Sequence, residues 1–145
     1  HMPYMRVGAM KISDHQVRSP LLNINNACQT CHKESEEEMK ARAENIQAKT
    51  LEMCDMSMAA LMDLIDAIKV GQEENVPETR LDEARMAQRR ASFFIDWVES
   101  ENSTGFHASQ ETARLLFKAM DYIRQGQVVL TETETEPGAE PVESE

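Results

Sequence analysis

Residues 35–71 read SEEEMKARAENIQAKTLEMCDMSMAALMDLIDAIKVG, and this stretch predicts a single long helix. Ser35 and Glu38 have the spacing of a capping box, and the acidic residues after Ser35 suit the positive end of the helix dipole. Apolar residues then alternate at intervals of three and four, as in a coiled coil: Leu51, Cys54, Met58, Leu61, Ile65 and Ile68. We expect Gly71 to end this helix, which would be about 50 Å long.

Two further helices are expected after the long one. Residues 72–77 form a polar connection, and the apolar spacing returns over 78–102 and again from Ser109 to Leu130. The positions expected to face the core are Ala84, Ala87, Ala91, Phe94, Val98, Ala113, Leu116, Met120 and Ile123. Short connections favour antiparallel neighbours, so the sequence predicts an all-α fold with three long helices over residues 35–130 in a coiled-coil-like arrangement.

The two ends of the chain differ from this helical region. Residues 1–34 carry prolines, a glycine and scattered Asn and Ser, and we expect an irregular segment there that a bound cofactor organises. Residues 131–145 repeat Thr and Glu without an apolar face, and we expect a disordered acidic tail. Three regions follow: 1–34, 35–130 and 131–145.

The pentapeptide Cys28-Gln29-Thr30-Cys31-His32 carries the clearest chemical signal. Two thiols at positions i and i+3 can each bond a haem vinyl group, while the histidine that follows can reach the iron. A short helix would bring both thiols to one side. Two other interpretations fit less well: a structural zinc site needs four ligands, and a thioredoxin-type pair should follow a strand.

The remaining candidate residues are two histidines and one cysteine. His15, inside the irregular segment, and His107, just ahead of the third helix, are each either an axial iron ligand or an ordinary surface histidine. Cys54 lies within the helical pattern and is expected to be a small buried hydrophobe.

Composition limits the choice of partner. The chain has 145 residues, the size of one domain, and a formal net charge of −11. Nucleic acid and anionic membrane surfaces would repel such a chain, so neither is expected as a partner. No window is long and apolar enough for a transmembrane segment, and we expect no signal peptide within the first residues given.

Several motifs together resemble the C-terminal part of ammonia-forming cytochrome c nitrite reductase, the pentahaem cytochrome c552 family. The resemblance covers residues 1 to about 130. The matching stretches, in order, are His1-Met2-Pro3, Ser13-Asp14-His15, Arg18-Ser19-Pro20, Ala27-Cys28-Gln29-Thr30-Cys31-His32 and Glu101-Asn102-Ser103-Thr104-Gly105-Phe106-His107.

The resemblance implies a role for each candidate residue. Cys28 and Cys31 match the attachment site of the last haem c, with His32 as its proximal ligand. His15 and His107 match distal ligands of the second and fourth haems. His1 falls where the fourth haem's own CxxCH would end, although the two cysteines before it are not in this sequence.

The resemblance also implies a setting. The family is periplasmic, reduces nitrite to ammonia, forms homodimers through long C-terminal helices and takes electrons from a membrane-associated cytochrome. Its catalytic haem and its calcium site belong to an upstream haem domain, so this chain is expected to be a fragment that is inactive alone and binds no calcium through these residues. Two alternatives stay open: a helical interaction module without cofactor, and a fragment of another multihaem cytochrome c.

Overall fold

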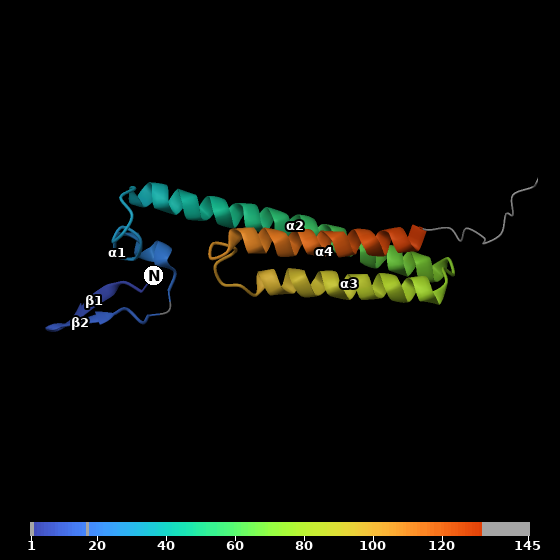
Figure 1. Ribbon diagram of the computed structural model, residues 1–145, viewed down its shortest axis with the longest axis horizontal. Coiled ribbons are helices and arrows are strands. Elements are labelled where there is room, and N and C mark those ends of the chain that lie inside the picture. The colour runs from blue at the N-terminus through green and yellow to red at the C-terminus, as the bar shows by residue number, and fades with distance from the viewer. Residues whose placement is uncertain (1, 17, 132–145) are drawn as a thin grey trace, which may run out of the picture.

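The structure is a computed structural model, and it describes residues 2–16 and 18–131. Three long helices dominate it: α2 (Glu36–Glu73), α3 (Glu78–Glu99) and α4 (Ser109–Thr131). Figure 1 shows them side by side, joined by short connections, so that successive helices run antiparallel. The expected all-α fold with three long helices is confirmed.

One apolar core joins the three helices. Leu64 of α2, Ile95 of α3, and Leu116 and Ile123 of α4 are almost completely buried. Gly126 lets α4 approach closely, because a Cβ at this position would lie 3.0 Å from the Leu64 methyl carbons. Cys54 is also buried in this core, as the helical pattern predicted.

The apolar stripe of α2 divides between two directions. Cys54, Leu61 and Ile68 face the core, but Leu51 and Met58, which belong to the same predicted stripe, are exposed. Several other inward positions of α2 are small or polar, such as Ser57, which donates to the Met53 carbonyl. A seven-residue repeat drifts around a straight helix, because 3.6 residues per turn do not divide evenly into seven. Only half of this stripe is therefore buried in the bundle.

The expected end of α2 at Gly71 is wrong. The helix continues to Glu73, and Gly71 is buried inside it against Leu81, Val76 and Leu130. The chain reverses instead at Asn75, which has a positive φ of 60°. Glycine at 71 therefore serves close packing rather than termination.

The amino-terminal segment is more regular than expected. Strands β1 (Tyr4–Val7) and β2 (Met10–Ser13) form an antiparallel hairpin, with Val7 paired to Met10 across a turn that contains Gly8 at a φ of 60°. A 3₁₀ turn, η1 (Pro20–Leu22), and a short helix, α1 (Ile24–Ala27), follow. The expectation of irregular structure is thus wrong for residues 4–13, where the alternation was too short to stand out.

The first turns of α2 extend beyond the other two helices. Figure 1 shows the connection between α3 and α4 lying partway along α2, with α1 and the hairpin near the start of α2. Two contacts join this connection to α2. Gly105 packs against the buried Thr50, and the Gln47 side chain donates to the Ser103 carbonyl at 3.1 Å. This contact fixes the α3–α4 connection to the long helix.

Replacing Gly105 with alanine is expected to destabilise the bundle. A Cβ would lie 2.3 Å from Thr50 Oγ1, and the φ of 78° is strained for any other residue. We expect the free energy of unfolding in urea to fall by about 2–4 kcal/mol. The matched control is Gly8→Ala, which has a similar φ but no atom within 4 Å and should cost about 1 kcal/mol. Equal losses in both variants would contradict the role of the Thr50 contact.

Candidate functional site

The Cys28–His32 segment forms a compact turn directly after α1. Cys28 caps α1 with its N–H bonded to the Ile24 carbonyl, and the N–H groups of Cys31 and His32 then donate to the Cys28 carbonyl at 3.2 and 3.0 Å. The motif therefore lies in turns at the end of a short helix rather than within one. The consecutive bonds to one carbonyl still curl the segment so that Cys28 and Cys31 are one turn apart.

The reactive groups of this turn are accessible. Cys31 and His32 are exposed, Cys28 is half-buried, and the thiols are free. His32 Nδ1 lies 3.6 Å from a carboxylate oxygen of Glu34. The Gln29 side chain donates to the Glu34 carbonyl at 3.0 Å, one residue before the Ser35 cap of α2. This bond links the turn to the start of the long helix.

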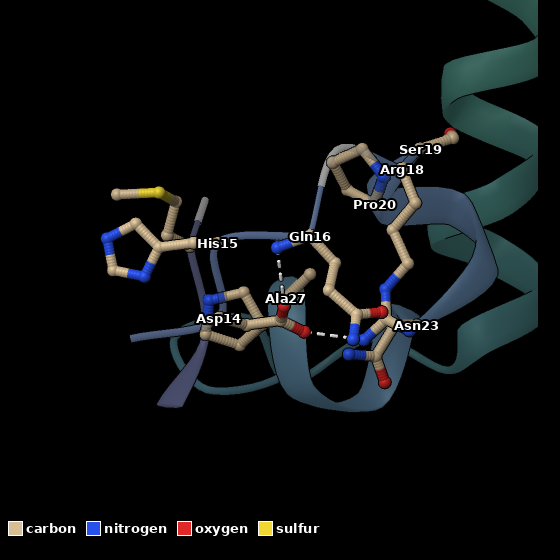
Figure 2. Close-up of a pocket in the computed structure, with 10 residues that line it drawn as sticks. Asp14, His15, Gln16, Arg18, Ser19, Pro20, Asn23 and Ala27 are labelled. Carbon is tan, nitrogen blue, oxygen red and sulfur yellow. Dashed lines mark hydrogen bonds and ion pairs between the residues drawn. The ribbon is translucent and has the colours of Figure 1, made fainter. Parts of the chain in front are cut away.

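His15 is presented by a loop that Asp14 anchors. Asp14 is buried, and its two carboxylate oxygens accept the Gln16 N–H at 2.9 Å and the Arg18 guanidinium at 2.5 Å. The Gln16 N–H and the Arg18 charge both lower the pKa of the Asp14 carboxyl. Figure 2 shows Asp14 pointing inward while His15 points away on the opposite side.

The His15 loop and α1 enclose a shared pocket. Its volume is about 240 Å³, and its lining includes Asp14, His15 and Arg18 from the loop together with Asn23 and Ala27. Because Ala27 directly precedes Cys28, the fold brings the His15 loop beside the base of the cysteine turn. The sequence alone did not predict this proximity.

His107 stands in the α3–α4 connection, held by Glu101. Its Nδ1 lies 3.0 Å from Glu101 Oε1, and its backbone N–H donates to Ser103 Oγ at 2.9 Å. Burial alone would raise the pKa of the Glu101 carboxyl, but hydrogen bonds from Ser103, His107 and the Gly105 N–H outweigh it and lower the pKa to about 2. The His107 ring is exposed, with 63% of its side chain accessible.

The hydrogen bonds fix the tautomer of both histidines. His15 Nδ1 lies 2.7 Å from the Ser13 carbonyl oxygen, and His107 Nδ1 faces an ionised carboxylate. Both partners can only accept, so Nδ1 carries the proton in each neutral ring. Nε2 is then left with its lone pair available, which is the state a metal-ligating histidine needs.

Among residues 2–16 and 18–131, no three His, Cys, Asp or Glu side chains gather as a metal-binding group. His15, His32 and His107 lie in three different segments: the loop after β2, the turn after α1 and the α3–α4 connection. His1 lies outside the described residues, and so does nearly all of the expected acidic tail, residues 132–145.

Two carboxylates that support the histidine loops were missed at the sequence level: Asp14 anchors the loop of His15, and Glu101 bonds the His107 ring. Asp14 and Glu101 occur in the stretches that carry the family resemblance, but neither had a role assigned. Their closeness to His15 and His107 in sequence was the available signal. Contact between Glu101 and His107 also depends on positive φ angles at Thr104 and Gly105, which composition does not reveal.

Comparison with known proteins identifies the family. A family model described as cytochrome c552 matches residues 1–145. The chain belongs to the cytochrome c552 family. A cytochrome c-552 of Maridesulfovibrio salexigens is 34% identical over 130 residues, and one of Bacteroides fragilis is 30% identical over 138 residues. These alignments cover 90% and 95% of this cytochrome c552-family chain but only 26% and 28% of the relatives. The chain therefore spans about a quarter of their length.

The residues of this cytochrome c552-family chain suit haem c. Its motif offers two accessible thiols one turn apart with an exposed imidazole directly after them. A cytochrome c requires this donor set, and the chemistry of free thiols beside an available imidazole fits it. Within the described parts of the chain, no helix is long and apolar enough to cross a membrane.

The low pKa of Glu101 predicts an acid-dependent loss of stability. A carboxyl whose folded pKa is about 2, against an ordinary 4.5, stabilises the fold above pH 4.5 and loses this effect as the pH falls towards 2. We expect wild type to exceed Glu101→Gln in free energy of unfolding at pH 6, and the gap to shrink between pH 4.5 and 2. Urea titrations at each pH measure it. A gap that stays constant would contradict this assignment.

Proposed function

We propose that this chain is the C-terminal part of a periplasmic multihaem cytochrome c nitrite reductase, which reduces nitrite to ammonia. Its own role is to attach one haem c, to supply axial histidines to neighbouring haems, to relay electrons and to form the dimer. The observation that carries the proposal is the accessible Cys28–His32 turn in a chain of the cytochrome c552 family.

Cys28 and Cys31 would make the covalent attachment. Each thiol adds across one vinyl C=C bond, with the sulfur bonding one carbon and the hydrogen going to the other, so no atom is lost. His32 would ligate the iron through its exposed imidazole, and the bonds of the turn hold it beside Cys31. When bound, the haem supplies one-electron redox chemistry at iron.

His15 and His107 would each ligate the iron of another haem. Each presents Nε2 while Nδ1 is bonded to an acceptor, and each lies on an anchored loop. We also assign a proximal ligand role to His1. The haems of these three residues would be held mainly by the upstream haem domain, which would also hold the catalytic haem and the calcium site. This chain would thus relay electrons, received ultimately from a membrane-associated cytochrome, without reducing nitrite alone.

The proposal divides the chain by task. Residues 1–34 would form the haem attachment segment, residues 35–130 the helical bundle with the His107 loop and the dimer interface, and residues 131–145 an acidic tail. The support for the first two assignments is that the bundle has a core of its own, whereas the His15 loop and the cysteine turn lie outside it. A bundle with such a core also suits the second candidate, a helical interaction module without cofactor.

Covalent haem attachment distinguishes the two candidates. Expressed with c-type maturation machinery, the chain should gain the mass of one haem and show a Soret band. Cys28→Ala combined with Cys31→Ala should abolish both signals, and Cys54→Ala, at a buried core cysteine, should keep them. A wild-type chain without added mass or Soret absorption would refute haem attachment and favour the cofactor-free module.

The dimer interface is proposed on the outward stripe of α2. Leu51, Met58 and Met62 are spaced at seven and four residues and are 55%, 36% and 51% exposed. Residues at this spacing lie on one helix face, so a second copy of α2 could pack against them and remove this apolar surface from water.

Charging this stripe is expected to weaken the dimer. Leu51→Glu with Met62→Glu should raise the dissociation constant at least about tenfold, equal to 1.4 kcal/mol, in sedimentation experiments. Met56→Glu is the matched control, since Met56 is 61% exposed on the same helix but about 140° around from Leu51. A wild-type chain that stays monomeric at high concentration, or equal effects of both variants, would contradict the proposed interface.

A further inference from the structure

The loop that carries His107 contains an unusually well-bonded carboxylate. Glu101 Oε1 accepts the Ser103 N–H at 2.9 Å and pairs with His107 Nδ1 at 3.0 Å. Glu101 Oε2 accepts Ser103 Oγ at 2.7 Å and the Gly105 N–H at 3.2 Å. Each oxygen therefore has two donors, and the carboxylate has little freedom to turn away from the imidazole.

We infer that Glu101 is a positioning residue that fixes the tautomer of His107 and strengthens its Nε2 as an electron donor to iron. This inference rests on the proposed function, because it assumes that His107 ligates a haem iron. It goes further by assigning a specific carboxylate to the tuning of that iron.

The charge of Glu101 is what distinguishes it from the partner of His15. His15 donates to the neutral carbonyl of Ser13, whereas His107 donates to a carboxylate. Both oxygens of Glu101 accept hydrogen bonds from donors, as those of an ionised carboxylate do. An anionic partner draws the Nδ1 proton towards itself and makes the imidazole a stronger donor, which stabilises ferric over ferrous iron. An iron bound at His107 should therefore have a lower potential than with a neutral partner.

The backbone of the loop supports the same orientation. The His107 N–H donates to Ser103 Oγ, and Ser103 Oγ itself donates to Glu101, so ring and main chain are held by neighbouring groups. Gly105 sits against Thr50 of α2, and the Gln47 side chain donates to the Ser103 carbonyl. The loop is thus fixed to a rigid element, which a ligand of defined direction requires.

A purely structural ion pair is the competing explanation. Glu101 and His107 are both at least one-third exposed, and an exposed pair of this kind often adds little to stability. Such a pair would not control which ring nitrogen carries the proton. The tautomer is therefore the property to measure.

Long-range ¹H–¹⁵N spectra of the chain at pH 8 report the tautomer of His107 directly. We expect Nδ1–H in wild type and a shift towards Nε2–H in Glu101→Gln. The control Glu111→Gln removes a carboxylate that bonds Arg114 at the start of α4 and should leave the His107 spectrum unchanged. A wild-type ring protonated at Nε2, or an unchanged tautomer in Glu101→Gln, would overturn the inference.

A ruthenium probe tests the donor strength. Pentaammineruthenium(II) binds accessible imidazole nitrogen, and replacing His1, His15 and His32 with glutamine directs it to His107. We expect the midpoint potential of the ruthenium adduct to be more positive in the Glu101→Gln variant than in the protein that keeps Glu101. The control Glu111→Gln should leave this potential unchanged. Equal potentials in Glu101 and Glu101→Gln would refute the tuning role.

A second variant separates positioning from loss of loop structure. Ser103→Ala removes the hydroxyl that bonds both Glu101 and the His107 N–H but keeps the carboxylate beside Nδ1. Positioning by Glu101 predicts that Ser103→Ala retains Nδ1–H and the lower potential, and a response identical to Glu101→Gln would count against it. Neither measurement needs haem, so this inference can fail while haem attachment at Cys28 and Cys31 succeeds, and the reverse.

Discussion

The arrangement of the molecule depends on the contact between the α3–α4 connection and the long helix. Gly105 has room for no side chain against Thr50, and Gln47 bonds the same connection through Ser103. Helix α2 is continuous from Glu36, and its first residues lie beside the cysteine turn. The same helix therefore holds the His107 loop at a fixed distance along its axis from that turn. The spacing between two candidate iron ligands is therefore a property of one helix rather than of flexible loops.

The helical pattern predicted the bundle because its apolar repeat extends over many turns. Ala84, Ala91, Val98 and Leu116 were all expected in the core and are buried there. The predictions of the end of α2 and of the amino-terminal segment were wrong, because they relied on local sequence patterns. Glycine is common at the end of a helix, and Gly71 was therefore expected there. Its lack of a side chain instead allows close packing against Leu81 and Val76, a contact that exists only in the folded chain. The hairpin escaped notice because four-residue strands show too little alternation.

The candidate site was predictable in its reactive residues but not in their supports. Their spacing alone singles out Cys28, Cys31 and His32, because covalent attachment of a haem requires these three residue types at fixed intervals in the sequence. Asp14 and Glu101 act through hydrogen bonds whose geometry depends on loop conformation, including the positive φ angles near Gly105. Carboxylates are common on the surface of an acidic chain, so sequence cannot distinguish the two that support a histidine loop from the many that are merely solvated.

The amino-terminal segment and the bundle differ in what can stabilise them. Within the described part of residues 2–34, only Asp14 and Ile24 are buried, while Tyr4, Val7 and Met10 of the hairpin are exposed. A segment with so little core cannot offset its own ordering entropy through apolar burial, and small folds of this kind usually depend on a covalent staple, a cofactor or a neighbouring domain. Attachment through Cys28 and Cys31 would supply both a staple and an apolar plane. The proposed haem and upstream domain would therefore stabilise this segment as well as serve its proposed function, whereas the three-helix bundle closes its core without them.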